Sequence, residues 1–366
     1  MPVDRPGGNS NDDETREPAI NAIRSCRRDS CRTIPRVSST SESRIRSEIS
    51  GRSHMVSEDG QNRQISTVMT PTSRAVSRWA PALVWLSLPL TAGSAFANAL
   101  DHRSTPVVLT AAIGLWSIWV IGLIAALAPS SVSLTTLRIV MPASLVASAW
   151  AALAVPDGAD IAESFALGMT SLCAVLSLSA AVGYTFINGS SYGDERRFPL
   201  RPPGPVLLGP IEVVWAAMVA SVFAGPLLLA AKQWIPGAIL TLLAIVLCVG
   251  GARALHQLSK RWLVLVPAGL VLVDQMTLLD ALLVQRHVVD SIGIAEEGST
   301  ATDLSAGAVG FQIEIRLSTP DSIIPTPARR DRHKIIEPVD VDAVRCTPSR
   351  PGWVLDAAKE RRLTVG

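Results

Sequence analysis

Apolar and polar positions divide the chain into three regions. Residues 1–78 carry isolated apolar residues without a period, 79–250 are apolar at nearly every position, and the chain after 261 has short apolar runs. A charge-free apolar run of about 17 residues or more can cross the roughly 30 Å hydrocarbon core of a bilayer as a helix. Six runs meet that condition, which predicts a polytopic membrane protein; they are 79–100, 106–128, 139–155, 165–187, 213–231 and 234–250.

The chain after the last span has the pattern of a small module of strands. We expect 251–260 to continue the last span as a linker helix. Beyond it, W-L-V-L-V and L-V-L-V-D flank Pro-Ala-Gly, a pattern typical of a β-hairpin. Pro351 then opens an amphipathic helix ending near Leu363. The predicted strands are 262–266, 270–274, 282–284, 288–294, 310–317 and 341–347, with a long flexible loop at 319–338.

The predicted fold class is therefore a membrane all-α domain of six transmembrane helices followed by a small soluble α+β module. Its antiparallel strands are closed by a C-terminal helix. Domain limits follow the same pattern: a disordered cytoplasmic N-terminus at 1–78, the transmembrane domain at 79–250, the linker helix at 251–260 and the module at 261–366.

Two motifs of the module carry a resemblance to a known family. They are R-W-L-V-L-V-P-A-G-L-V-L-V-D at 261–274 and C-T-P-S-R-P-G-W-V-L-D-A-A at 346–358. Both resemble the bacterial pleckstrin-homology-like domains that follow membrane helices, and the whole chain looks like multi-pass membrane proteins of high-GC, actinobacterial-type bacteria. The resemblance implies a strongly bent antiparallel sheet capped by a helix, used for binding or assembly without catalysis. It supplies no ligand residues.

The N-terminal region has too little apolar surface to offset chain entropy, so we predict that it is disordered. Its basic residues are all Arg, interleaved with acids. One hypothesis is that translation starts at Met55 or Met69, which leaves 1–54 outside the native protein. The alternative, an Arg-rich tether to lipid or nucleic acid, is disfavoured by the interleaved acids.

The distribution of basic residues predicts the orientation of the spans. Lys and Arg in short loops mark the cytoplasmic side of a membrane protein. Alternating sides puts nine of them on one face and two on the other. We therefore expect a multi-pass protein of the cell membrane with both termini cytoplasmic. The nine are Arg74, Arg78, Arg138, Arg196, Arg197, Arg201, Arg253, Lys260 and Arg261, with Arg138 assigned to the second loop.

The loop between the fourth and fifth spans is the densest polar feature beside the membrane. Residues 192–205 read Y-G-D-E-R-R-F-P-L-R-P-P-G-P, where four prolines exclude a helix. The charged residues of this loop are candidates for docking the module or a partner, or for contacting anionic head groups. The alternative is that the loop only sets topology. The candidates are Asp194, Glu195, Arg196, Arg197 and Arg201.

Reactive groups are sparse. The sequence has no paired-His metal motif, nucleophile elbow or phosphate-binding glycine loop, and the predicted span interiors carry no charge. We therefore expect no enzyme activity, cofactor, metal, nucleic acid or small-molecule ligand. The partners expected are the lipid bilayer and another protein that binds 261–366. The leading interpretation is a non-enzymatic membrane protein with a cytoplasmic binding or assembly module, and the alternative is a transporter or channel subunit. A lipid-modifying enzyme using Asp194, Glu195 or Glu212 is a third interpretation.

Overall fold

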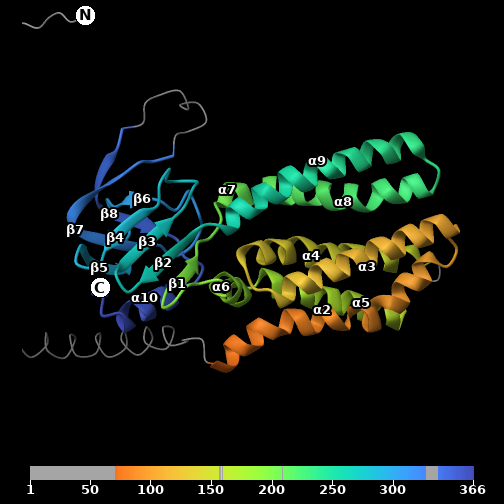
Figure 1. The fold of residues 1–366 in the computed structure, drawn as a ribbon, viewed down its shortest axis with the longest axis horizontal. Coiled ribbons are helices and arrows are strands. Elements are labelled where there is room, and N and C mark those ends of the chain that lie inside the picture. The colour runs from red at the N-terminus through yellow and green to blue at the C-terminus, as the bar shows by residue number, and fades with distance from the viewer. Residues whose placement is uncertain (1–70, 156–157, 159, 208, 327–336) are drawn as a thin grey trace, which may run out of the picture. The chain divides into compact units, whose positions relative to one another are not determined.

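The computed structural model describes residues 71–155, 158, 160–207, 209–326 and 337–366 of the 366-residue chain. The predictions for residues 1–70, including the alternative starts, lie outside that range. Within it, a group of long helices is followed by two small sheets and one last helix (Figure 1). This arrangement confirms the predicted fold class.

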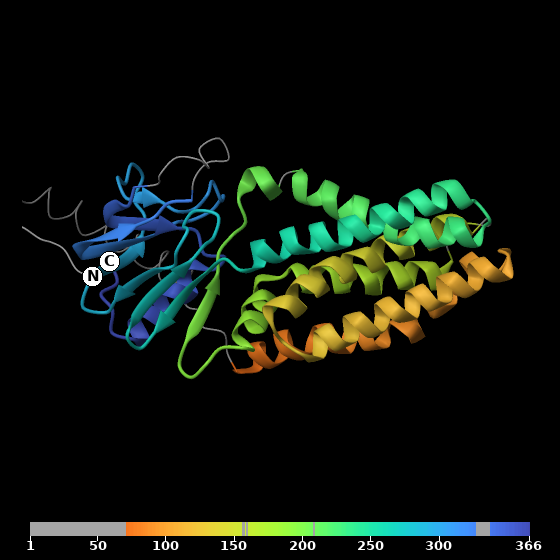
Figure 2. The same ribbon diagram turned by 45° about the horizontal axis from the view of Figure 1, so that its top comes forward.

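The described residues contain six helices that are long and apolar enough to cross a membrane, so the chain is a multi-pass membrane protein. In Figures 1 and 2, α8 and α9 run side by side, next to the group formed by α2 to α5. Two short helices, α6 and α7, lie at the ends of the membrane domain nearest the sheets. The helices are α2 (Pro71–Leu100), α3 (Thr105–Leu127), α4 (Ser131–Ala154), α5 (Ile161–Leu178), α6 (Ala180–Asn188), α7 (Gly204–Leu207), α8 (Pro210–Ala230) and α9 (Trp234–Ser259).

Three details of the membrane domain differ from the prediction. Residues 71–78, assigned to the disordered region, are the first turns of α2, which begins with a proline as first turns allow. The fourth run is broken at Ser179, whose extended backbone ends α5 and whose hydroxyl caps α6. Arg138 lies inside α4 and Glu163 in the first turn of α5, so the spans do carry charge.

The membrane domain is packed unevenly along its length. The half nearest the sheets, which we call the module side, holds a cluster of large buried side chains, whereas the far half buries mainly alanines. In the α8–α9 hairpin, glycines allow close approach: a Cβ at Gly225 or Gly237 would lie 2.8 Å from a backbone nitrogen of the other helix. The module-side cluster includes Trp85, Leu134, Leu137, Met141, Cys173 and Phe186, and the far cluster is Ala92, Ala95 and Ala166.

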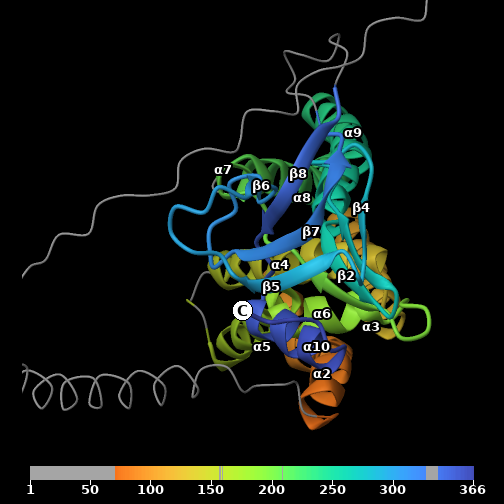
Figure 3. The same cartoon turned by 90° about the vertical axis from the view of Figure 1, so that its left-hand side faces the viewer.

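The module consists of two four-stranded sheets and helix α10 (Pro351–Glu360), which lies beside β5 (Figure 3). The first sheet has the order β1-β2-β3-β4 and the second β5-β7-β8-β6. Gly269 closes the β2–β3 hairpin with a positive φ, where a Cβ would overlap the carbonyl oxygen of Val284. The strands are β1 (Arg196–Pro199), β2 (Trp262–Val266), β3 (Gly269–Val273), β4 (Leu282–Gln285), β5 (Val289–Ile294), β6 (Thr302–Asp303), β7 (Ile313–Ile323) and β8 (Val339–Cys346).

The module also departs from the prediction in places. Six strands and the closing helix occur near their predicted positions, but β1 and β6 were missed. The loop prediction is wrong for residues 319–323, which belong to β7 after an irregularity in its pairing with β8. Pro320 lies in that irregular stretch, since proline cannot donate to the ladder. Two sheets replace the one bent sheet that the resemblance implies.

Candidate functional site

The loop between α6 and α8 is part of the module. Its strand β1 pairs antiparallel with β2, with Arg196 opposite Leu265 and Pro199 opposite Trp262. The backbone N–H of Leu200 then donates to the carbonyl oxygen of Arg261 at 3.0 Å. One sheet therefore combines a strand from between two spans with strands that follow the last span. We call residues 188–201 and the module residues that they contact the junction.

Alternation of side chains explains why this stretch forms a strand despite its prolines. Phe198 and Leu200 are 3% and 5% exposed and lie in the module core with Leu263 and Leu265. Pro199 lies between them at the sheet edge, where the lack of an N–H leaves no unpaired donor. The two apolar side chains thus connect the spans to the module core.

Asn188, the last residue of α6, fixes the start of β1. Its side-chain oxygen accepts from the backbone N–H of Arg197 at 2.9 Å, and its amide donates to the carbonyl of the same residue at 2.8 Å. The side chain therefore pairs with Arg197 as a neighbouring strand residue would. This contact joins a membrane helix to the module sheet.

Aromatic side chains fill the space between α6 and the module. The ring of Tyr184 lies 5.6 Å from that of Phe198 and 5.3 Å from that of Trp353, centroid to centroid. The guanidinium carbon of Arg197 lies 5.6 Å from the Trp262 ring, within the range of a cation–π contact. Apolar and cationic contacts thus reinforce the backbone pairing.

The five candidate residues of the loop all lie at the junction. Arg196 forms an ion pair with Glu360 of α10, and the backbone carbonyl of Asp194 accepts from Arg361. Glu195 and Arg197 pair with each other at 2.5 Å. The Arg201 guanidinium donates to the carbonyl of Val309 at 3.0 Å, and its backbone N–H donates to that of Thr347 at 2.8 Å. Four of the five therefore contact the module directly, since Arg197 also contacts the Trp262 ring.

A buried ion pair lies directly behind the junction. Arg261 and Asp274 are each 2% exposed and form two parallel hydrogen bonds of 2.8 and 2.6 Å. Arg261 also donates to the carbonyls of Arg201 and Ser305, at 2.9 and 3.2 Å. A buried guanidinium with its donors paired in this way is held in one position. It therefore links the loop, the β2–β3 hairpin and the β6–β7 connection.

Cys346 lies in the same buried region. Burial raises the pKa of its thiol to about 12, with the Asp274 carboxylate adding to the rise and the Arg261 guanidinium opposing it. The thiol is therefore neutral at physiological pH, and a neutral thiol is a poor nucleophile. Cys346 behaves as a core side chain.

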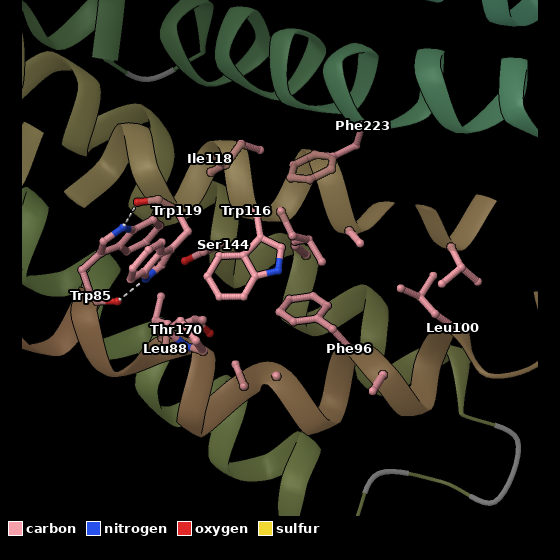
Figure 4. A pocket seen from close by; sticks show the side chains of 18 of the residues that line it. Trp85, Leu88, Phe96, Leu100, Trp116, Ile118, Trp119, Ser144, Thr170 and Phe223 are labelled. Carbon is pink, nitrogen blue, oxygen red and sulfur yellow. Dashed lines mark hydrogen bonds between the residues drawn. The ribbon is translucent and has the colours of Figure 1, made fainter. Parts of the chain in front are cut away.

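The far half of the membrane domain contains a cavity of about 600 Å³ between α2, α3, α4, α5 and α8. Figure 4 shows that Phe96, Trp116 and Phe223, from α2, α3 and α8, gather around one space. Most of the other lining groups are aliphatic or small. The lining runs along α2 from Trp85 to Leu100 and ends at Asp101 in the following turn.

Two tryptophans close the inner end of this cavity. The indole N–H of Trp85 donates to the carbonyl of Trp119 at 2.8 Å, and that of Trp119 donates to the carbonyl of Trp85 at 3.0 Å (Figure 4). The second bond has a local cause: Pro89, four residues after Trp85, has no N–H to bond that carbonyl. The Trp85 ring packs on Gly122, where a Cβ would lie 2.5 Å from it. Both indoles are therefore fixed in place.

The polar groups in the cavity wall are satisfied or lie at its outer end. Ser144 donates to the carbonyl of Met141 at 2.7 Å and Thr170 to that of Ala166 at 2.8 Å, each within its own helix. Asp101, an exposed residue, is the charged group of the lining. The wall thus presents apolar surface along most of its length.

Three features of these sites were not predicted from the sequence: strand β1, the Arg261–Asp274 ion pair and the cavity. The first two have a signal in the sequence. Phe198 and Leu200 alternate with polar or proline positions, as in a half-buried strand. Arg261 and Asp274 flank the hairpin symmetrically, and its two-residue turn places them opposite each other. The cavity left no signal, because it depends on how far the helices are spaced.

Comparison with known protein families, curated proteins and solved structures finds no match to this chain.

Proposed function

We propose that the chain is a non-enzymatic membrane protein whose module binds a protein partner at the cytoplasmic face, held in a fixed position by the junction. The observation that carries the proposal is the contrast between the two edges of the first sheet. One edge strand, β1, comes from the membrane domain; the other, β4, pairs with β3 on one side and has no paired strand on its outer side among the described residues. The module is thus attached at one edge and open at the other.

The open edge has the chemistry of a docking strand. Leu283 in β4 is 61% exposed, and Leu279 and Met276 just before the strand are also exposed. Proteins usually protect an exposed edge with charge, proline or a bulge, whereas β4 carries none of these. An extended peptide that adds to this edge would gain backbone hydrogen bonds and an apolar contact at Leu283. The resemblance to pleckstrin-homology-like modules supports the same role.

The cytoplasmic placement and the lack of catalysis rest on the sequence. Positive residues concentrate on the module side of the spans. The chain has no recognisable catalytic motif. A reporter fused to Gly366 tests the first point: activity of a cytoplasmic reporter is expected, and activity of a reporter that works only outside the cell would contradict it.

Site-specific cross-linking tests the docking edge. A photo-crosslinking amino acid replaces Leu283 in the full-length protein in its native membrane, and the matched control carries it at Ile294, also exposed, in the second sheet. We expect a discrete protein adduct from position 283 that is absent from position 294. Absence of any adduct at 283, or the same adducts at both positions, would contradict the proposal.

One observation favours the alternative of a transporter or channel subunit. At the break between α5 and α6, Arg138 Nε lies 3.4 Å from the carbonyl oxygen of Ser177. Broken helices and membrane-embedded charges occur in transport pathways. Ion flux into proteoliposomes that is abolished by Arg138→Met and retained by Arg138→Lys would support this alternative. Equal flux with empty liposomes would exclude it for the ions tested.

A further inference from the structure

We propose that the far-half cavity binds one long hydrocarbon chain of a bilayer lipid, taken from the leaflet opposite the module. The ligand class is an amphiphile with a single acyl or isoprenoid chain inserted between the helices. This inference does not depend on the proposed function of the module, because it concerns a different end of the molecule.

The position of the cavity selects a ligand from one leaflet. It lies between five of the membrane-spanning helices and is lined along α2 from Trp85 to Leu100. Sixteen residues of helix rise about 24 Å, at 1.5 Å per residue, which exceeds half of the roughly 30 Å hydrocarbon core. The Trp85–Trp119 pair closes its inner end, and Asp101 marks its outer end. The space thus runs in the direction of a lipid chain.

The chemistry of the wall selects a hydrocarbon. The hydroxyl groups of Ser144 and Thr170 donate to backbone carbonyls of their own helices, so the wall offers little hydrogen bonding to a polar ligand. Water needs two to four polar partners to occupy such a space stably. Aromatic rings and small aliphatic groups instead provide contact along a chain, and the volume of about 600 Å³ is within the range of ligand sites.

The outer end suits a polar head group. Asp101, His102 and Arg103 follow the last turn of α2, and all three are exposed. This short turn therefore offers charges of both signs where a head group would lie. Neither positive nor negative charge dominates at this turn. The hydrocarbon chain of the ligand, and not its head group, would therefore contribute most of the binding free energy.

Glycines provide a matched pair of variants. A Cβ at Gly93, which lines the cavity, or at Gly114, which does not, meets no heavy atom within 4 Å. Gly93→Leu therefore extends into the cavity without displacing a neighbour, while Gly114→Leu adds the same atoms to α3 elsewhere. Both substitutions replace a helical glycine, so they affect helix propensity alike.

Photolabelling of the full-length protein in nanodiscs tests the proposal. One sample contains a phospholipid with a diazirine on its acyl chain, and the other an isoprenyl phosphate with a diazirine on its chain. We expect label on α2 and α3 cavity residues in at least one sample, which identifies the source. Labelling should fall about tenfold in Gly93→Leu, because the new side chain replaces several methylene groups of the ligand. It should stay unchanged in Gly114→Leu.

Two results would overturn the proposal: equal labelling of the cavity in both variants, or label spread evenly over the outer faces of α8 and α9. If Gly93→Leu fails to yield folded protein by size-exclusion chromatography, Ala97→Phe serves as the second filling variant, since Ala97 lines the cavity and is exposed. The same tenfold fall is expected from it.

Discussion

The two ends of the membrane domain are built in opposite ways. At the module side, large side chains pack closely, and the junction adds β1, the Asn188 bridge and the Arg261–Asp274 pair. At the far end, alanines and Gly93 leave a cavity of about 600 Å³. Helices α2 to α5 take part in both, so the difference between the two ends arises from their side chains and not from helix order.

This difference indicates where rigidity is placed in the molecule. Buried polar groups with satisfied partners hold one geometry, because any other arrangement leaves a donor or charge unpaired. An apolar cavity contains no polar groups that must be paired. The free energy of the protein therefore differs less between its empty and its filled state. The module and the module-side helix ends are therefore joined by satisfied polar contacts, whereas the cavity wall at the far end contains few polar groups.

The largest expected effect comes from removing β1. The segment 261–366 expressed alone lacks Phe198 and Leu200, and each buried side chain of this kind contributes about 1.5–3 kcal/mol. We expect its free energy of unfolding to be about 3–6 kcal/mol lower than that of a version in which residues 192–202 are fused through a flexible linker. Urea unfolding followed by tryptophan fluorescence measures the difference. Equal stability of the two proteins would mean that β1 contributes little.

The next effect concerns the buried ion pair. Arg261→Met leaves the Asp274 carboxylate buried without its partner, which costs about 3–5 kcal/mol. Arg261→Met combined with Asp274→Leu removes both charges and should regain most of that loss. Thermal unfolding of the full-length protein in detergent compares the variants. A double variant no more stable than the single one would show that the hydrogen bonds to Arg201 and Ser305 matter more than the pair.

A smaller effect is expected for Asn188→Ala. It removes two hydrogen bonds to the backbone of Arg197, at about 0.5–1.5 kcal/mol each. Protease cleavage within 190–195 should become faster, because the start of β1 is no longer held. Ser191→Ala is the control, since its hydroxyl bonds only the carbonyl of Asn188. Equal cleavage rates in the two variants would contradict a role for Asn188 in holding β1.

The smallest expected effect depends on pH and is confined to the module. Hydrogen bonds from Ser299 and Arg316 lower the pKa of Glu314 below its ordinary value. A lowered folded-state pKa stabilises the fold above the unfolded pKa, and this stability is lost as the pH falls through the folded value. Ser299→Ala should therefore destabilise the protein by about 1 kcal/mol at pH 7 and by less at pH 3. Thermal unfolding at both pH values checks this, and an equal loss at both would rule out the charge as its cause.

The sequence predicted the parts of the fold that follow from periodicity. Six apolar runs became six spans, and β2 was located at 262–266 as expected. Short elements defined by their partners were missed: β6 has two residues, and β1 is a strand only because β2 offers it an edge. The break at Ser179 also escaped, because the apolar run continues through it.

For the candidate site, the location of the residues followed from the sequence, whereas their partners did not. The charges of the 192–205 loop identified a location, and the structure places all five candidates at the junction. Their partners, Glu360, Arg361 and Val309, lie more than 100 residues away, and a single sequence carries no record of such distances. Arg138 was misplaced because a charge near a span end suggests a loop, although its aliphatic stem suits a helix.

A disulfide cross-link tests the central claim most directly, namely that the loop between the spans is a strand of the module. Arg197 and Val264 are partners in the β1–β2 register, and Val271 and Leu283 are partners within the module. In a cysteine-free background, Arg197→Cys with Val264→Cys should oxidise to an intramolecular disulfide in the membrane-embedded protein. The extent should match that of Val271→Cys with Leu283→Cys. Cross-linking of the second pair without the first would show that β1 does not belong to the sheet.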